Sequence, residues 1–341
     1  MFANRCRRLT VRVLSLTACC LSFALSAHAQ QVINGVQVFP SNSIFNTRID
    51  SLPIDKNSSK YVNSLGATRL FHPDWGTDPS YGIPFNLVTG IPPTVPLINY
   101  PTFQYSDESD AGPYPTVTTA LAIEGAAWDP NVNGGDRHCL MVDTTNGVLY
   151  ELYSATVDGT TGDVSGGSGA IYNLNSNALR PDTWTSADAA GLPIFPLLVN
   201  LQEATAGPIK HAFRMTGNGA NGHIWPARHS AGSVAGFPPF GQRFRLKKSF
   251  DVSKAPSNVS KNIVVAFQQY GLIYADNGSN WYVTGAPDPG WADIDLNYLK
   301  SLKGSDFEAV NESSLMASPD SGAVPRSFKP PGSVVNWPKV K

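Results

Sequence analysis

The sequence predicts an all-β protein, an antiparallel β-sandwich of the jelly-roll type with two short helices near the C-terminus. Short apolar runs separated by turn residues recur along the chain, a pattern typical of sandwiches. Glycine and proline are abundant, at 30 and 27 of 341 residues, and together form about a sixth of the chain against a usual ~12%. Only two segments space their apolar residues with the helical period, so strands dominate the prediction.

The first residues have the three parts of a secretory signal peptide. Four arginines and no acidic residue precede residue 13, an apolar run covers residues 13–25, and Ala27-His28-Ala29 is a cleavage pattern of small residues. We therefore expect a cut after Ala29 and a secreted or periplasmic protein. A rival lipoprotein box ends at Cys19, where cleavage would leave a lipid-anchored chain. The apolar run continues well past Cys19 and favours the later cut.

The mature part, residues 30–341, is expected to be one β-rich domain with long wrapping N-terminal loops. Without the four leader arginines, 21 of the 25 basic residues remain against 26 acidic ones. This balance argues against a nucleic-acid partner, because nucleic acids select basic surfaces. No run beyond the leader has the ~18 apolar residues that a membrane span needs. The sequence does not indicate an oligomeric state.

The N-terminal part and the first hairpin follow from local patterns. Between residues 31 and 115, short apolar pieces such as Val32-Ile33 and Leu87-Val88 predict short strands within loops. Two apolar runs, residues 138–143 and 148–153, are joined by a turn that ends in Asn146-Gly147. Asn-Gly between such runs is the strongest short-range hairpin signal.

The C-terminal half is expected to combine strands with both helices. A second hairpin is predicted from residues 272–275 and 281–283, around the turn Asp276-Asn277-Gly278. Residues 260–270 have apolar side chains at helical spacing and stop at Gly271, and residues 293–303 repeat this pattern before Gly304. Further strands are predicted over residues 211–215, 223–225 and 243–247.

Carboxylates near one histidine are the candidate catalytic groups. Glu124 and Asp136 bracket a turn-rich stretch, and His138 opens the first hairpin. A general acid and a general base of a glycosidase need such carboxylates on either side of the scissile bond. Asp136 is the first choice, with Glu124 or Asp188 as its partner. The competing interpretation is that these carboxylates only cap turns.

The hairpin register also makes a specific prediction about one strand face. The numbers of two residues that pair across this hairpin are expected to add up to an odd number. Even-numbered residues of the first strand then share a face with odd-numbered residues of the second, which places His138 and Glu151 on the same face as Leu140 and Val142. An imidazole and a carboxylate on an apolar face need each other or another partner. The pair is either structural or catalytic.

Arginine, asparagine and tryptophan residues are the candidate groups for substrate binding. Indole rings stack on pyranose faces, while guanidinium and amide groups bind sugar hydroxyls. The alternative for each tryptophan is packing in the core or at its rim. The candidates are Arg180, Trp184, Trp225, Arg228, Asn277 and Trp281.

Several runs resemble a group of secreted bacterial β-rich proteins to which no activity is attached. The resemblance rests on Gly135-Asp136-Arg137-His138, residues 106–114, residues 180–193, residues 224–229 and residues 275–278. It implies export and one long domain. It brings no catalytic residue to this chain.

The favoured function is a secreted carbohydrate-active enzyme that hydrolyses glycosidic bonds of a polysaccharide, without a metal or another cofactor. One alternative is a polysaccharide lyase, with His229 as the base and Arg228 or Asn277 neutralising a uronate. Another is a non-catalytic carbohydrate-binding or envelope protein. Two carboxylates about 5–10 Å apart in a cleft favour hydrolysis, whereas a flat aromatic face without them favours binding.

Overall fold

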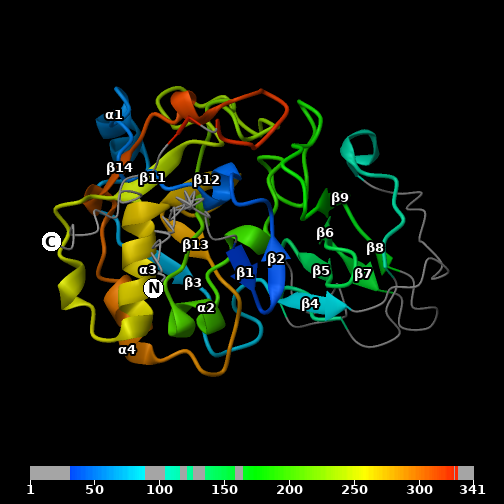
Figure 1. Cartoon of the computed structure of the whole chain (residues 1–341), viewed down its shortest axis with the longest axis horizontal. Helices are drawn as coiled ribbons and strands as arrows, with labels where there is room; N and C mark the ends of the chain where they lie inside the picture. Colours follow the sequence, from blue (N-terminus) through cyan, green and yellow to red (C-terminus); the bar gives the residue numbers. More distant parts are fainter. Residues whose placement is uncertain are drawn as a thin grey trace, which may run out of the picture.

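The computed structural model describes residues 31–88, 104–115, 121–125, 135–157, 164–325 and 327–328. Their strands form two main sheets at opposite ends of the molecule (Figure 1). Two-stranded ribbons accompany these sheets: β1 (Gln31–Ile33) with β2 (Val36–Val38), and β7 (Thr156–Val157) with β8 (Val164–Ser165). The predicted signal peptide and its cleavage site lie outside the described residues.

The larger sheet has six strands and mixes parallel with antiparallel pairs. Strands β10 and β12 are parallel, as are β13 and β3, while the other neighbours are antiparallel. In spatial order the strands are β14 (Phe307–Ala309), β11 (Arg243–Leu246), β12 (Leu272–Asn277), β10 (Phe213–Gly217), β13 (Tyr282–Thr284) and β3 (His72–Asp74).

The smaller sheet has four strands and contains the first predicted hairpin. Its order is β4 (Phe85–Val88), β5 (Cys139–Asp143), β6 (Val148–Tyr153) and β9 (Ser168–Asn173). The β5–β6 turn forms because the Asp143 carboxylate accepts the backbone N–H groups of Thr145 and Asn146, at 2.9 and 3.0 Å. Gly147 then adopts a φ of 66°, which glycine tolerates without steric cost.

The second predicted hairpin is wrong. β12 and β13 do follow each other in the sequence, but β10 lies between them and pairs with both. The turn residues therefore cross over the end of β10, where the N–H of Gly278 donates to the carbonyl of Gly217. The prediction failed because the best partner of each strand is distant in the sequence.

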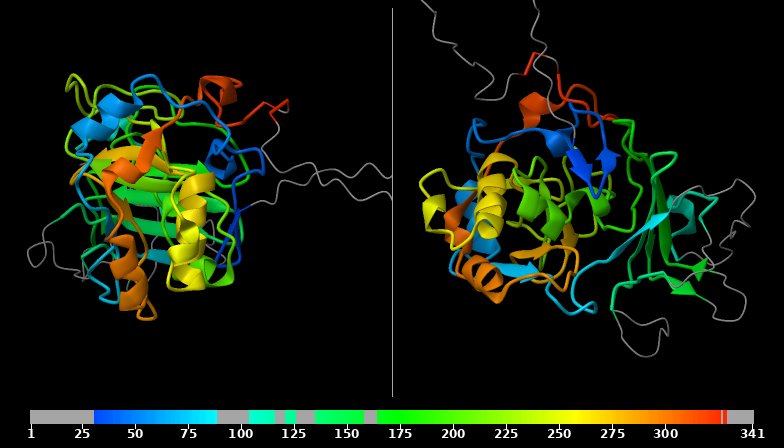
Figure 2. Two further views of the ribbon diagram at one scale, coloured as in Figure 1. Left: turned by 90° about the vertical axis from the view of Figure 1, so that its left-hand side faces the viewer. Right: turned by 60° about the horizontal axis from the view of Figure 1, so that its bottom comes forward.

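Helices cover one face of the six-stranded sheet. Both predicted helices are present, as α3 (Asn258–Gln269) and α4 (Asp293–Leu299), and both lie in front of the strands in the left view of Figure 2. The Ser257 hydroxyl caps α3 by accepting two backbone N–H groups. Two short helices were not predicted, α1 (Ser58–Ser64) and α2 (Leu201–Ala206). The single 3₁₀ turns are residues 44–46, 106–108, 195–197, 252–254, 304–306 and 313–315.

Side chains on β10 alternate between the two faces of the larger sheet. The Phe213 ring contacts Phe267 of α3, with 5.2 Å between ring centroids. Because neighbouring strand residues point to opposite faces, Arg214 points away from the helices. That opposite face is the one that meets the rest of the molecule.

Residues 186–199 connect the two main sheets. The Glu151 carboxylate of β6 accepts the N–H groups of Ile194 and Phe195. On the other side, the N–H of Ala190 donates to Ala275 of β12, and the N–H of Val199 donates to Thr284 of β13. Apolar side chains of this segment and of both sheets form one continuous core. The connecting segment thus holds β6 of the smaller sheet in place relative to β12 and β13 of the larger one.

The prediction of a β-rich protein with two C-terminal helices is confirmed. The antiparallel part is wrong for three strand pairs, β10–β12, β13–β3 and β4–β5, which are parallel. A sandwich or jelly roll is not confirmed by this topology. Within the described ranges no helix is both long and apolar enough to traverse a bilayer.

Candidate functional site

A pocket of about 270 Å³ opens where the two main sheets approach each other. Asp136 and Tyr153 line it from the side of the smaller sheet, and Asp276 and Asn277 line it from the end of β12. The remaining wall combines polar side chains with apolar surface and comes from β9, loops and the connecting segment: Tyr105, Ser168, Thr185, Ser186, Ala187, Ala189, His229 and Ala231.

Two carboxylates and one imidazole meet in this region. A carboxylate oxygen of Asp136, one of Asp276 and a ring nitrogen of His138 all lie within 4.8 Å of one another. Asp136 is exposed and precedes β5, where its carbonyl accepts the N–H of Ser154 at 2.7 Å. Asp276 is largely buried at the end of β12, and its Oδ1 accepts the N–H of Asn277 at 2.7 Å. Both carboxylates are therefore held on anchored backbone.

His138 is held as an imidazolium. Its Nδ1 lies 2.6 Å from Oε2 of Glu124, and its Nε2 lies 2.9 Å from the carbonyl of Ala187. Both partners only accept hydrogen bonds, so both ring nitrogens must donate. Burial lowers the pKa of His138, but the Glu124 carboxylate outweighs burial and raises that pKa to about 9. The same contact lowers the pKa of Glu124, against the opposing effect of its burial.

These contacts decide what the cluster can bind. Aspartate and histidine are common ligands of divalent metals. Here the two nitrogens of His138 already donate to Glu124 and Ala187, which leaves the ring no lone pair for a metal. The cluster therefore presents two carboxylates beside a fixed positive charge, which suits proton transfer better than metal ligation.

Arg214 joins Asp276 to a second buried carboxylate. Its Nε donates to Asp188 at 2.8 Å, its Nη2 donates to Asp276 at 2.5 Å, and its Nη1 donates to Thr284 at 2.7 Å. One guanidinium faces two carboxylates in a dry environment. Burial raises the pKa of Asp188 and of Asp276, and Arg214 opposes this only in part. Because ionising both Asp188 and Asp276 is unfavourable, these two carboxyl groups tend to keep one proton between them.

The predicted shared face of His138 and Glu151 is confirmed. Leu140 pairs with Glu151 across the hairpin, so His138, Leu140 and Glu151 point to the same side. The two polar groups do not pair with each other. Glu151 accepts the N–H groups of Ile194 and Phe195, and burial raises its pKa to about 7. Its contacts assign it a structural role, holding the connecting segment.

His229 is the histidine among the residues that line the pocket. Its Nδ1 lies 2.7 Å from the carbonyl of Ala189, so Nδ1 carries a proton. Its Nε2 lies 3.6 Å from the carboxylate of Glu108. The ring is half-buried and lines the pocket, where Nε2 can exchange a proton with a bound molecule.

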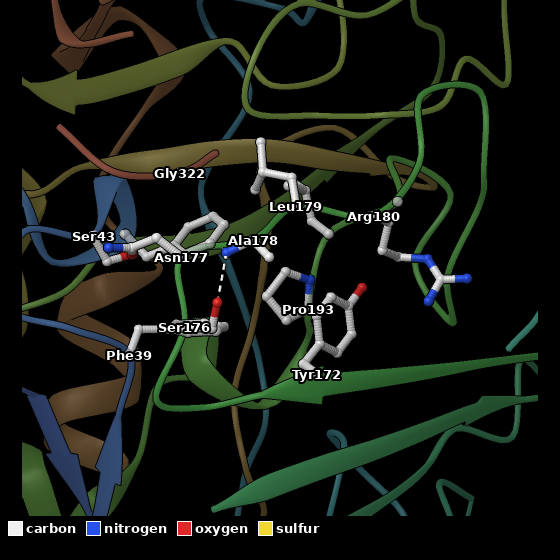
Figure 3. Close-up of a pocket in the computed structure, with 13 residues that line it drawn as sticks. Phe39, Ser43, Tyr172, Ser176, Asn177, Ala178, Leu179, Arg180, Pro193 and Gly322 are labelled. Atoms are coloured by element: carbon white, nitrogen blue, oxygen red, sulfur yellow. Dashed lines mark hydrogen bonds between the residues drawn. The ribbon is translucent and has the colours of Figure 1, made fainter. Parts of the chain in front are cut away.

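Arg180 and Trp184 do not line this pocket. The guanidinium of Arg180 is buried, pairs with Asp110, donates to the carbonyls of Thr185 and Glu108, and lies 5.6 Å from the centroid of the Trp184 ring. Figure 3 shows it directed away from a separate void of about 10 Å³ beside Tyr172 and Pro193. That void is too small for a sugar. The contacts of Arg180 with Asp110 and the carbonyl of Glu108 instead give it a structural role, holding the loop that carries Glu108.

The other predicted binding residues are also placed away from the pocket, except for Asn277. Trp281 is fully buried, and its N–H donates to the carbonyl of Gly66. Its proposed role as an exposed stacking platform is wrong, because its ring packs on Phe307 in the core. Trp225 is half-buried and donates to Ser321. Arg228 is buried and donates to Pro319 and Asp320.

The sequence interpretation missed Asp276 and Arg214. The sequence around Asp276 predicts only a turn, since Asp-Asn-Gly is a strong turn signal. Arg214 lies between Phe213 and Met215, both fully buried. A charged residue in such an apolar strand demands a buried partner, and this signal could have pointed to a carboxylate cluster.

No protein-family model, no curated protein and no solved structure matches the chain.

Proposed function

We propose that the chain is an exported carbohydrate-active enzyme that hydrolyses glycosidic bonds of a polysaccharide. The observation that carries the proposal is the juxtaposition of Asp136 and Asp276 at one pocket, with oxygens no more than 4.8 Å apart. Glycosidases need two carboxyl groups that flank the scissile bond. The pair differs from the predicted partners of Asp136, because Glu124 and Asp188 do not line the pocket, whereas Asp276 does.

The surroundings of the two carboxyls suggest different roles. Burial and the nearby charge of Asp136 raise the pKa of Asp276, so Asp276 is suited to donate a proton to the leaving oxygen. Asp136 is exposed and is suited to attack the anomeric carbon. A covalent glycosyl–Asp136 intermediate would form, and Asp276 would then take the proton of the attacking water.

The remaining pocket groups are compatible with a sugar. The hydroxyls of Ser168, Thr185 and Ser186 and the amide of Asn277 can exchange hydrogen bonds with sugar hydroxyls. Tyr105 and Tyr153 provide aromatic rings at the same pocket. This combination supports a polyhydroxylated substrate.

The charges favour hydrolysis over a lyase reaction. A lyase must neutralise a uronate carboxylate, and the predicted groups were Arg228 or Asn277. Asn277 lines the pocket but carries no charge, which leaves Arg228 as the candidate cation. Its guanidinium is bound by Asp320 and two carbonyls, and the pocket itself presents Asp136 and Asp276. An anionic sugar ring would be repelled there, so a neutral or cationic polysaccharide is the better substrate.

The proposal can be tested with the purified mature chain on a panel of neutral, cationic and uronate-containing polysaccharides. New reducing ends without absorbance at 235 nm would support hydrolysis. Absorbance at 235 nm on a uronate polymer would support the lyase alternative. Binding of a polymer without cleavage would replace the enzyme with a carbohydrate-binding protein.

A further inference from the structure

A serine, a histidine and an aspartate form a separate hydrogen-bonded chain beside the pocket. Nδ1 of His223 lies 2.6 Å from the hydroxyl oxygen of Ser230, and Nε2 of the same ring lies 3.3 Å from Oδ1 of Asp182. None of the three residues belongs to the carboxylate cluster. They are the residue types of a nucleophilic hydrolase in the required order.

The backbone around His223 is held on two sides. The N–H of Ile224 donates to the carbonyl of Phe240, and the N–H of Phe240 donates to the carbonyl of Gly222, at 2.8 and 2.9 Å. On the other side, the N–H of Gly222 donates to the carbonyl of Gly232 at 3.0 Å. The imidazole thus projects from a backbone fixed between two loops, which limits its freedom before any ligand binds.

The hydrogen-bond polarity suits activation of the serine. The Asp182 carboxylate only accepts, so Nε2 of His223 carries the proton in this contact. Nδ1 then has a free lone pair that can accept the Ser230 proton. In many serine hydrolases the two ring nitrogens have the opposite assignment, but either nitrogen of an imidazole can act as the base.

Ser230 is accessible and has donors nearby for a developing negative charge. Its side chain is exposed. Within the parts of the chain that the structure describes, the backbone N–H groups of Ser230 and Ala231 donate to no acceptor. Free N–H groups at and after a nucleophile are the usual components of an oxyanion hole.

We propose that Ser230, His223 and Asp182 form a second hydrolytic site, which cleaves small O-acyl esters. The Ser230 oxygen attacks the ester carbonyl carbon while its proton passes to Nδ1 of His223. The tetrahedral adduct then expels the alcohol, which takes that proton, and leaves an acyl-serine. Water attacks the acyl group, gives a proton to Nδ1, and the carboxylic acid leaves as Ser230 recovers its proton.

The location connects this site to the proposed polysaccharide pocket. Ser230 lies between His229 and Ala231, and both of these line the pocket. Ser230 itself is not among the lining residues, so its natural substrate would be an acyl substituent on a part of the polymer that extends beyond the pocket. Only this choice of natural substrate rests on the proposed function, because the esterase chemistry itself needs no glycosidase activity.

The test uses the mature chain with a fluorophosphonate probe and with p-nitrophenyl acetate. We expect mass spectrometry to locate the probe on Ser230, and Ser230→Ala to lose the label. His223→Gln should slow labelling and ester turnover by at least about 10²-fold, the lower scale of general-base catalysis. Ser233→Ala is the matched control, since Ser233 is exposed in the same loop, and it should react like the wild type.

Two results would overturn the proposal. One is a folded wild-type chain that neither takes the label nor cleaves p-nitrophenyl acetate faster than the heat-denatured chain. The other is labelling of Ser230 that is unchanged in His223→Gln, which would mean that the histidine does not activate the serine. Wild-type labelling is decisive even where a variant fails to fold, and it is independent of the polysaccharide panel.

Discussion

Asp136 and Asp276 come from different sheets, and their carboxylate oxygens lie within 4.8 Å of each other at one pocket. Asp136 precedes β5 of the smaller sheet, and Asp276 lies near the end of β12 of the larger one. The connecting segment between the sheets fixes this approach through Glu151 and Ala190. The proposed activity therefore depends on how the two sheets are joined.

The activity should fall as pH rises through the raised pKa of Asp276. A general acid works only when protonated, and burial keeps Asp276 protonated to a higher pH than a solvated aspartate. In Asp276→Asn, turnover should drop by roughly 10²–10⁴-fold, and the alkaline limb of the pH profile should disappear. The control is Asp293→Asn, an exposed carboxylate in α4, which should keep the wild-type profile. An unchanged alkaline limb in Asp276→Asn would assign that limb to another group.

Hydrolysis should proceed with retention of the anomeric configuration. Retaining glycosidases place their carboxyl groups about 5–5.5 Å apart, and inverting ones need about 6.5–9.5 Å for a water molecule. An oxygen of Asp136 and one of Asp276 lie no more than 4.8 Å apart, which is nearer to the shorter spacing than to the longer one. Proton NMR of the first product formed on a cleaved polymer measures this directly. An initial product of inverted configuration would contradict the nucleophilic role of Asp136.

The free energy of unfolding should decrease between about pH 6.5 and 9. Glu124 raises the pKa of His138 from 6.5 to about 9 in the folded chain. A raised pKa stabilises the fold fully below the unfolded value and loses that effect as pH passes the folded value. The change is at most about 3 kcal/mol. Urea unfolding of Glu124→Gln at pH 6.5 and pH 9 should show a smaller decrease in the free energy of unfolding than the wild type does. A decrease equal to that of the wild type would mean that a group other than the His138–Glu124 pair causes the pH dependence.

Removal of Arg214 should destabilise the chain through the carboxylates that it leaves behind. Breaking a buried ion pair on one side typically costs about 3–5 kcal/mol, because a charge stays buried without a partner. We expect a loss of this size for Arg214→Met in urea unfolding. The double variant Arg214→Met/Asp188→Asn should lose less than the sum of the single variants. Additive losses would show that Asp188 and Arg214 are not coupled.

Local signals in the sequence predicted the elements that depend on nearby residues. The β5–β6 hairpin follows from the turn around Asp143 and Gly147, and its register gave the shared face of His138 and Glu151. The end of α3 follows from Gly271, which has a φ of 73°. In each case the deciding contacts lie within a few residues.

The predictions that were wrong or incomplete concern residues whose deciding contacts lie far away in the sequence. β12 and β13 were joined wrongly because β10, which separates them, comes from a distant part of the chain. Trp281 follows an exposed turn, yet its own φ of 62° accompanies a ring buried in the core. The partner of Asp136 was also missed, since Asp276 reaches it only through the packing of two sheets. Such pairs depend on long-range packing, which a single sequence does not encode in its local pattern.

The central claim is that Asp136 and Asp276 act on one bond, and a double-mutant cycle on a cleaved polymer tests it most directly. Asp136→Asn and Asp276→Asn should each reduce the turnover of the folded chain by about 10²-fold or more. The melting temperature should stay close to wild type in Asp136→Asn, because Asp136 is exposed, and should fall in Asp276→Asn, which loses a buried ion pair with Arg214. The double variant should lose little more than either single variant, because residues that act as a unit are not additive. The account would be contradicted if Asp136→Asn lowered the melting temperature but its folded fraction kept near-normal turnover.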